Sequence, residues 1–192
     1  PGGARLSEKK LARASGNRTV AMVAVAEMER LIAERALVMK DNRRVAIAEM
    51  SPERFEEIVF ARRTLEPELA GRALPRLDKA QTLALAEIDD AIDRSMADGD
   101  IEGYMRLNHA FHFTIYSLAA APTLLALTES IWLQFGPFMR AAYGRFGTAK
   151  LEDQHQLALA AIRRGDERAL RKSITEDIMQ GMRFIGEEAL KE

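Results

Sequence analysis

From residue 51 onward, apolar residues recur every three or four positions, a spacing that places them along one face of a helix. Ser51-Pro52-Glu53 is a typical start, with a capping hydroxyl, a proline in the first turn and an acid near the positive end of the dipole. The pattern predicts about six helices, over about 52–74, 78–97, 100–119, 122–145, 151–164 and 166–190. Pro67 is expected to bend or restart the first helix, and Gly136-Pro137 to kink the fourth. Helices joined by such short loops form an antiparallel bundle.

Residues 1–48 follow a different pattern. The expected elements are two helices and two short strands, over about 6–12, 19–35, 37–39 and 45–47. A basic turn at 40–44 joins the two strands. Two short helices followed by a basic-tipped hairpin are the layout of a winged helix-turn-helix. We therefore expect two domains, a small winged helix-turn-helix at 1–48 and an all-α antiparallel bundle at 49–192.

Charge divides along the same boundary. Residues 1–48 carry ten Lys or Arg and five Asp or Glu, whereas residues 49–192 carry 18 and 24, and the whole chain has a net charge of −1. A basic head on an acidic body is expected where the head meets a polyanion such as DNA. The lack of Cys excludes a disulfide scaffold, a Cys-ligated zinc site and a Cys nucleophile. No apolar run approaches the roughly 18 residues of a membrane span, and no leader is recognisable, so we expect a cytoplasmic protein without membrane contact.

Four polar side chains stand where the helical spacing calls for apolar ones. Asn108 and His112 lie one turn apart on the expected core face of the third bundle helix, and His155 and Asp177 occupy core positions of the fifth and sixth. A buried carboxylate needs a partner, because desolvating an unpaired charge is unfavourable by several kcal/mol. Two imidazoles, a carboxylate and a carboxamide are suitable ligands for a divalent metal, with zinc or nickel expected. The alternative is four hydrogen-bonded core residues without a metal.

Two arginines are candidates for binding an anionic ligand. Arg62 falls on the apolar face of the first bundle helix, where it snorkels, pairs with an acid or receives an anion. Arg140, in the fourth helix, is a weaker candidate of the same kind. His109 lies off the core stripe and is expected at the surface. The acids outside the stripe are expected on solvent faces, which leaves the candidate metal site without a catalytic base.

Several short motifs along the chain match one pattern. They are Pro1-Gly2, Leu6-Ser7-Glu8, Leu11-Ala12, Arg62-x-x-Leu65-Glu66, Phe111-His112, His155 and Gly165-Asp166. Together they resemble the GntR-type transcription regulators of the FadR-like subfamily, which join a winged helix-turn-helix to a helical effector-binding domain of the FCD type. In the likeness, Asn108 stands in the place of a metal-binding Asp, and Asp177 in the place of a metal-binding His.

The resemblance implies a dimeric, ligand-responsive repressor rather than an enzyme. A small carboxylate effector would enter the bundle, bind the metal, and alter the spacing of two DNA-binding heads on an operator. The implied residues are Asn108, His112, His155 and Asp177 for the metal, Arg62 and Arg140 for the effector, and Arg18, Thr19, Arg43 and Arg44 for DNA. The segment over 17–24 keeps the Arg and Thr of the family's recognition helix and lacks its Pro.

Two other functions stay open on the sequence. One is a metal-dependent hydrolase or lyase built on the helical bundle. The other is a helical dimerisation module whose DNA-binding head is degenerate.

Overall fold

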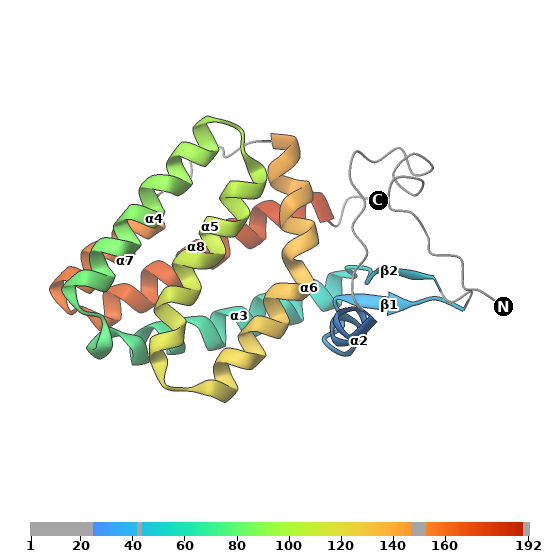
Figure 1. Ribbon diagram of the computed structural model, residues 1–192, viewed down its shortest axis with the longest axis horizontal. Helices are drawn as coiled ribbons and strands as arrows, with labels where there is room; N and C mark the ends of the chain where they lie inside the picture. Colours follow the sequence, from blue (N-terminus) through green and yellow to red (C-terminus); the bar gives the residue numbers. More distant parts are fainter. Residues whose placement is uncertain (1–24, 42–43, 147–152, 190–192) are drawn as a thin grey trace.

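A computed structural model describes residues 25–41, 44–146 and 153–189 of the 192-residue chain. This part of the chain is mostly helical, with seven α-helices and one two-stranded sheet (Figure 1). The helices are α2 (Val25–Ala33), α3 (Pro52–Ala73), α4 (Lys79–Ala97), α5 (Ile101–Tyr116), α6 (Pro122–Phe146), α7 (Gln154–Arg164) and α8 (Glu167–Ala189). Helices α3 to α8 form the bundle that the periodicity predicts, and no helix of the described part is long and apolar enough to cross a membrane.

The predicted start and stop residues cap these helices. Ser51 Oγ and Asp100 Oδ1 each accept a hydrogen bond from the backbone N–H three residues later, at 3.2 and 2.9 Å. Gly165 ends α7 with a φ of 65°, in the left-handed region where a residue without Cβ is favoured. Asp166 then caps α8 with a hydrogen bond of 2.9 Å. Each cap satisfies an N–H that has no partner inside its helix.

Helix α3 continues through Pro67, so of the two predicted outcomes the restart is wrong, while the bend stays a prediction. Proline removes one intrahelical hydrogen bond. The helix persists because its second half packs against α8, where Leu69 and Ala70 are fully buried. Arg171 of α8 also donates to the Pro67 carbonyl oxygen at 2.9 Å. Helix α6 also continues through Pro137, and the kink predicted at Gly136-Pro137 stays a prediction.

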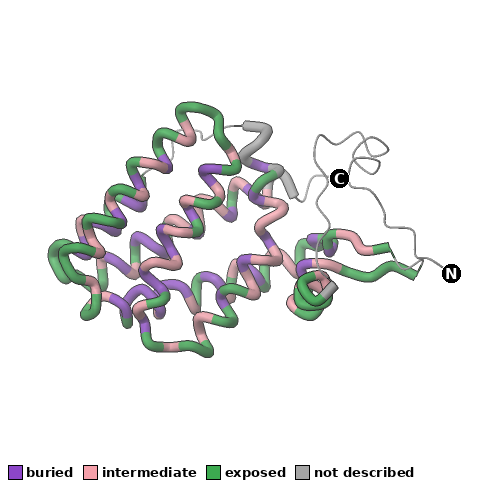
Figure 2. Tube along the Cα trace, in the orientation of Figure 1, coloured by how far each residue is buried: buried purple, intermediate pink, exposed green. Residues whose placement is uncertain are grey.

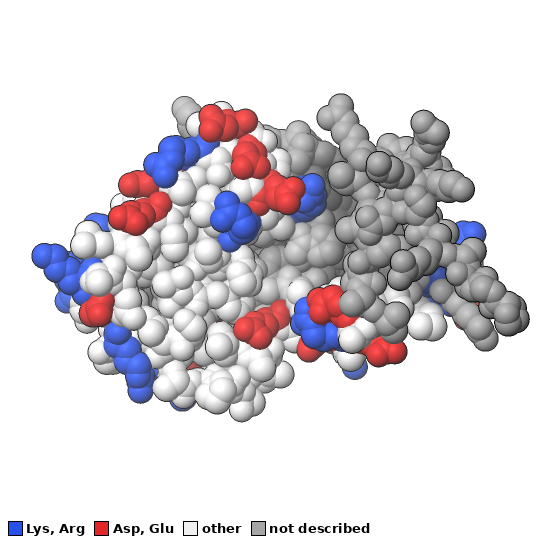
Figure 3. All heavy atoms as spheres, in the orientation of Figure 1, with Lys and Arg blue, Asp and Glu red and all other residues white. Residues whose placement is uncertain are grey.

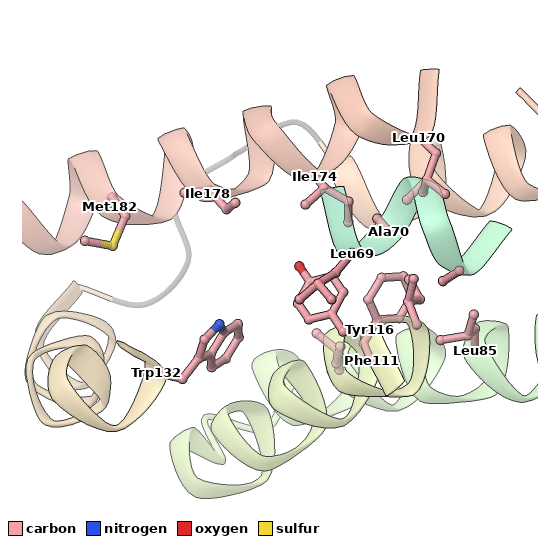
Figure 4. Packing of buried hydrophobic residues seen from close by; sticks show 14 of the residues in the cluster. Leu69, Ala70, Leu85, Phe111, Tyr116, Trp132, Leu170, Ile174, Ile178 and Met182 are labelled. Atoms are coloured by element: carbon pink, nitrogen blue, oxygen red, sulfur yellow. The ribbon is translucent and has the colours of Figure 1, made fainter. Parts of the chain in front are cut away.

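Helix α8 contacts α3, α6 and α7, and α4 packs on α5 and α7. Figure 2 shows the buried positions on the inward sides of the helices and the exposed ones outside. Figure 4 shows the core between α3, α4, α5, α6 and α8, built from side chains that include Leu69, Leu85, Phe111, Tyr116, Trp132, Ile174 and Met182. Each fully buried apolar side chain contributes about 1.5–3 kcal/mol, so this core holds the bundle together.

The predicted hairpin is present. Strand β1 (Leu37–Met39) pairs with β2 (Val45–Ile47) in antiparallel register, with Leu37 opposite Ile47. We call α2 and this hairpin the head. Figure 1 shows the head beside α3 and α6 at one end of the bundle.

Several predictions about the head fall outside the described residues. Helix α2 lies within the second predicted helix, over 19–35, and the first predicted helix is outside the described part. Of the four predicted DNA-binding residues, Arg44 is described and exposed, while Arg18, Thr19 and Arg43 are not described. The winged helix-turn-helix therefore stays a prediction, as does the domain boundary between residues 48 and 49.

Candidate metal centre

Three of the four predicted metal ligands converge inside the bundle. His112 of α5, His155 of α7 and Asp177 of α8 each place one ligand atom within 4.8 Å of the others. Nε2 of His112 is 3.2 Å from Asp177 Oδ2, and Nε2 of His155 is 3.8 Å from Asp177 Oδ1. The Asp177 carboxylate thus faces one imidazole with each oxygen. Its side chain is 28% exposed, so the cluster is least buried at this carboxylate.

Asn108 lies on the same helix, one turn before His112. Residues four apart in a helix share a face, so the carboxamide stands on the side of α5 that carries His112. It is buried, at 7% exposure. This position agrees with a fourth ligand, and that role stays a prediction.

A hydrogen-bond chain fixes the proton of His112. The Tyr116 hydroxyl donates its one proton to Glu66 Oε2 at 2.9 Å. It therefore accepts at its other contact, a hydrogen bond of 3.1 Å from His112 Nδ1–H. A neutral His112 with its proton on Nδ1 leaves the Nε2 lone pair free to bind a metal.

His155 is set in the same way by a carboxylate. Its Nδ1 lies 3.0 Å from Asp89 Oδ1, so Nδ1–H donates to this buried acid. Gln156 holds the other Asp89 oxygen with a hydrogen bond of 2.5 Å from Nε2. The His155 ring also stacks on Phe111, at 4.1 Å between centroids. These contacts hold the ring in place with Nε2 facing Asp177.

The residues present fit a divalent metal. Nε2 of His112 and Nε2 of His155 are buried and have no hydrogen-bond partner among the described residues. Leaving a buried polar atom unpaired is unfavourable by about 1–3 kcal/mol. A cation between the two nitrogens and the Asp177 carboxylate gives both of them a partner, and two nitrogens with one oxygen are common ligands of zinc and similar ions.

The electrostatics of the cluster favour an ionised Asp177. Burial alone would raise the pKa of this carboxyl group, but His112, His155 and Arg62 outweigh burial and lower the pKa to about 2. Burial lowers the pKa of His155, yet Asp89 and Asp177 outweigh it, and the pKa is raised above its ordinary value. Asp89 and Asp177 therefore favour a positive charge at the position of His155.

Arg62 is buried beside the centre, and it is paired with an acid. Its guanidinium binds Glu66 through Nε to Oε1 at 2.5 Å and Nη2 to Oε2 at 3.3 Å. It lies over two rings of α6, at 4.9 Å from the centroid of Trp132 and 4.2 Å from that of Phe135. Through Glu66, Arg62 joins the hydrogen-bond chain that ends at the metal ligands.

Arg140 and His109 lie away from this network. Arg140 is exposed on α6, and its predicted role in effector binding stays a prediction. His109 is exposed as predicted. Its ring nevertheless stacks on Phe113 at 4.1 Å and meets Trp132 edge-on at 5.4 Å.

Sequence reasoning missed three residues that hold the ligands in place. The expectation that the remaining acids face solvent is wrong for Glu66 and Asp89, which are 0% and 2% exposed. Asp89 lies between Leu85 and Ile92 at helical spacing, a signal that could have placed it in the core. For Tyr116 the sequence holds no such signal, because a tyrosine on an apolar stripe is typical of any core.

Comparison with known protein families shows to which family this chain belongs. The family model described as the FCD domain matches residues 57–179, a range that contains all four candidate ligands. The chain belongs to the FCD family. It is a GntR-type transcription regulator of the FadR-like subfamily, as its motifs indicate.

Two relatives illustrate the family. The HTH-type transcriptional regulator McbR of Escherichia coli K12 is 26% identical over 187 residues, which cover 95% of this chain and 83% of that protein. The solved structure of E. coli McbR has a TM-score of 0.79 at 24% identity, covering 97% of this chain and 88% of that one. A GntR transcriptional regulator from Rhodococcus sp. RHA1 has a TM-score of 0.68 at 23% identity, with the same coverage. The structures establish a shared fold, and these relatives are regulators rather than enzymes.

Proposed function

We propose that this FCD regulator binds a divalent metal through His112, His155 and Asp177 and uses it to sense a small organic acid. The observation that carries the proposal is a pair of buried Nε2 atoms that face one carboxylate at 3.2 and 3.8 Å without forming a well-aligned hydrogen bond. Zinc and nickel are the expected ions. Asn108 is a weak fourth ligand, or it donates a hydrogen bond to the effector.

Charge explains why the effector is an acid. When bound, the metal supplies a positively charged seat for carboxylate oxygens. Asp177 is the one carboxylate among the four proposed ligands, so a dication leaves a net charge of +1 there. Arg62 adds a cation nearby: it is close enough to help lower the pKa of Asp177. Its two hydrogen bonds to Glu66 use Nε and Nη2, and a guanidinium has five N–H donors in all.

The output of the regulator is DNA binding by the head. Arg18, Thr19, Arg43 and Arg44 are the proposed contacts, and the basic hairpin tip would meet phosphate. The proposal rests on membership of a transcription-regulator family and on the excess of basic residues in the first 48 positions. Binding of this kind weakens steeply as salt is added, because each phosphate contact releases counterions.

A homodimer would bring two heads to one operator. Phe60 on α3 is 73% exposed and Leu127 on α6 is 51% exposed, and these two helices contact each other. Large apolar side chains exposed on adjacent elements favour association. We propose that exposed apolar side chains of this kind form the dimer contact, and that effector binding tightens or releases DNA by changing the spacing of the heads.

The test compares wild type with Asn108→Asp by calorimetric melting, with and without zinc or nickel. In the proposed site the variant adds a hard anionic oxygen, so it binds metal about tenfold more tightly or better. It also removes the net positive charge, so the melting shift caused by sugar acids, hydroxy acids and dicarboxylates becomes smaller than in wild type. A destabilised variant that neither metal rescues would contradict the proposal, because a second buried carboxylate without a metal is simply unfavourable.

A further inference from the structure

A pocket lies apart from the candidate metal centre, where α2 of the head meets α5 and α6 of the bundle. Its volume is about 530 Å³, within the range of pockets that bind small molecules. Met105 of α5 and Trp132, Leu133 and Met139 of α6 line it, and Arg30 of α2 reaches its edge. Figure 3 shows that much of the surface over α5 and the first half of α6 carries no charged side chain.

Trp132 separates this pocket from the metal centre. Its ring lies 5.4 Å from the ring of His112 and 4.9 Å from the Arg62 guanidinium carbon, measured to centroids of the aromatic rings. The same residue lines the pocket, whereas none of the described lining residues is a proposed metal ligand. The pocket and the centre are therefore two sites that share one wall.

The charges at the pocket favour an uncharged occupant. Its lining contains two basic residues, Arg30 and Arg106, two acidic ones, Glu102 and Glu129, and one histidine, His109, all exposed. Arg30 is also paired with Glu27, its neighbour on α2, at 2.7 Å. The two arginines and the two glutamates balance each other, so the pocket favours neither an anionic nor a cationic ligand.

The wall formed by α6 offers a backbone acceptor. Pro137 has no N–H, so the carbonyl oxygen of Leu133 lacks the donor that an unbroken helix would supply four residues later. Gly136 also lines the pocket, and it has no side chain that could cover the nearby backbone of α6. A Cβ at this position would meet nothing within 4 Å, so the space beside it is open. A ligand with an N–H or O–H group can supply the missing donor.

We propose that this pocket is a second ligand site, which takes a small, uncharged aromatic molecule that carries one N–H or O–H donor. Aromatic rings pack well against Trp132 and against the methionine sulfurs of Met105 and Met139. The donor binds the Leu133 carbonyl oxygen. Because Arg30 belongs to α2, a molecule in this pocket contacts the head and the bundle together, and it restrains α2 against α6.

The test uses the full chain and the fluorescent probe N-phenyl-1-naphthylamine, which is uncharged, aromatic and carries one N–H. Trp132 is the single tryptophan of the chain, so energy transfer from tryptophan to the probe reports binding beside that residue. We expect saturable binding of one probe per chain, with quenching of Trp132 emission. Absence of saturable binding, or one probe per two chains, would overturn the proposal.

Two variants test the location of the probe. Gly136→Leu fills the pocket and is expected to weaken binding about tenfold or more. Leu133→Lys places a charge on the apolar wall, at a half-buried position that a lysine tolerates, and should weaken binding similarly. Wild-type affinity in a folded Gly136→Leu or Leu133→Lys would contradict the proposal, and circular dichroism shows which of them are folded.

Two control variants separate this site from other surfaces. Phe60→Ala removes the large apolar side chain that is 73% exposed on α3, and it should leave probe binding within about twofold of wild type. A large loss in Phe60→Ala would mean that the probe binds the outer face of α3 and not the pocket. His155→Ala disrupts the proposed metal site and should also leave probe binding unchanged, so the two proposals fail or stand independently.

Discussion

At the candidate metal centre, polar side chains from five helices bind one another. At the junction between head and bundle, by contrast, one side chain binds mainly backbone. Arg62, Glu66, Tyr116, His112 and Asp177 form a continuous series of contacts inside the core. Most of these groups have a second polar partner, so moving one of them leaves another unpaired. Buried networks of this kind specify one geometry.

The junction depends on Arg54, at the start of α3. Its guanidinium donates to the carbonyl oxygens of Arg35 and Glu49, both at 2.7 Å, and to Gln134 Oε1 of α6 at 3.0 Å. Arg54 is half-buried, and its backbone partners are present whatever the side chains there. A rigid centre and a junction held by few contacts suit the proposed sensor, in which the head would move because the less stable region opens first.

The largest effect is expected from breaking the buried ion pair. Glu66→Ala leaves Arg62 charged and unpaired in the core, which should lower the free energy of unfolding by about 3–5 kcal/mol. Glu68→Ala is the matched control on the same helix: Glu68 pairs with Arg72 and Arg171 near the surface, and its loss should change stability by about 1 kcal/mol or less. Urea unfolding of both variants measures the difference, and equal values would contradict the buried network.

A smaller effect is expected from changing the support of a ligand. Asp89→Asn replaces the carboxylate that accepts from His155 Nδ1–H, which should weaken metal binding about 10–100-fold. Asp90→Asn changes the neighbouring exposed acid and should leave metal affinity unchanged. Titration calorimetry with zinc compares the two. An Asp89→Asn protein with wild-type affinity would show that Asp89 does not position His155.

At the junction, Arg54→Ala should change global stability by only about 1 kcal/mol, because it removes hydrogen bonds at a half-buried site. Its local effect should be larger. Hydrogen exchange of amides in α2 should become faster while exchange in α8 stays the same. If α2 and α8 both kept their wild-type exchange rates, the head would be held by other contacts than Arg54.

The smallest effect is a pH dependence of the metal-free chain. The raised pKa of His155 contributes stability that is fully present below about 6.5 and is lost as pH rises through the folded-state pKa. His109 works in the opposite direction, since the partial burial of its ring against α6 and the nearby His112 lower its pKa. With a chelator present, the melting temperature of wild type should therefore fall more between about pH 6 and pH 8 than that of His155→Gln. If the melting temperatures of the two proteins changed in parallel with pH, His155 would not be the source of the pH dependence.

Much of the bundle could be predicted from sequence because its signals are local. Periodic apolar residues and the caps at Ser51, Asp100 and Asp166 place the helices nearly where they are. The restart at Pro67 was wrong because tertiary packing against α8 outweighs a lost backbone hydrogen bond. Local propensity does not contain that contact, which joins residues far apart in the chain.

The candidate site was predictable only in part, for the same reason. His112, His155 and Asp177 could be found because each interrupts an apolar stripe. Their supports could not be found so easily: the hydrogen bond from Tyr116 to Glu66 joins residues 50 positions apart, and that between His155 and Asp89 spans 66. Such pairs depend on how helices are arranged in space, and spacing along one helix does not reveal it.

The central claim is that two of the three histidines of this chain hold a metal. The most direct test is zinc and nickel titration calorimetry on purified, chelator-treated wild type, His112→Ala, His155→Ala and His109→Ala. We predict about one metal per chain for wild type and for His109→Ala, whose changed residue lies on the exposed side of α5. His112→Ala and His155→Ala should each bind at least about a hundredfold more weakly. Equal affinity in all four folded proteins, or no binding by wild type, would contradict the account.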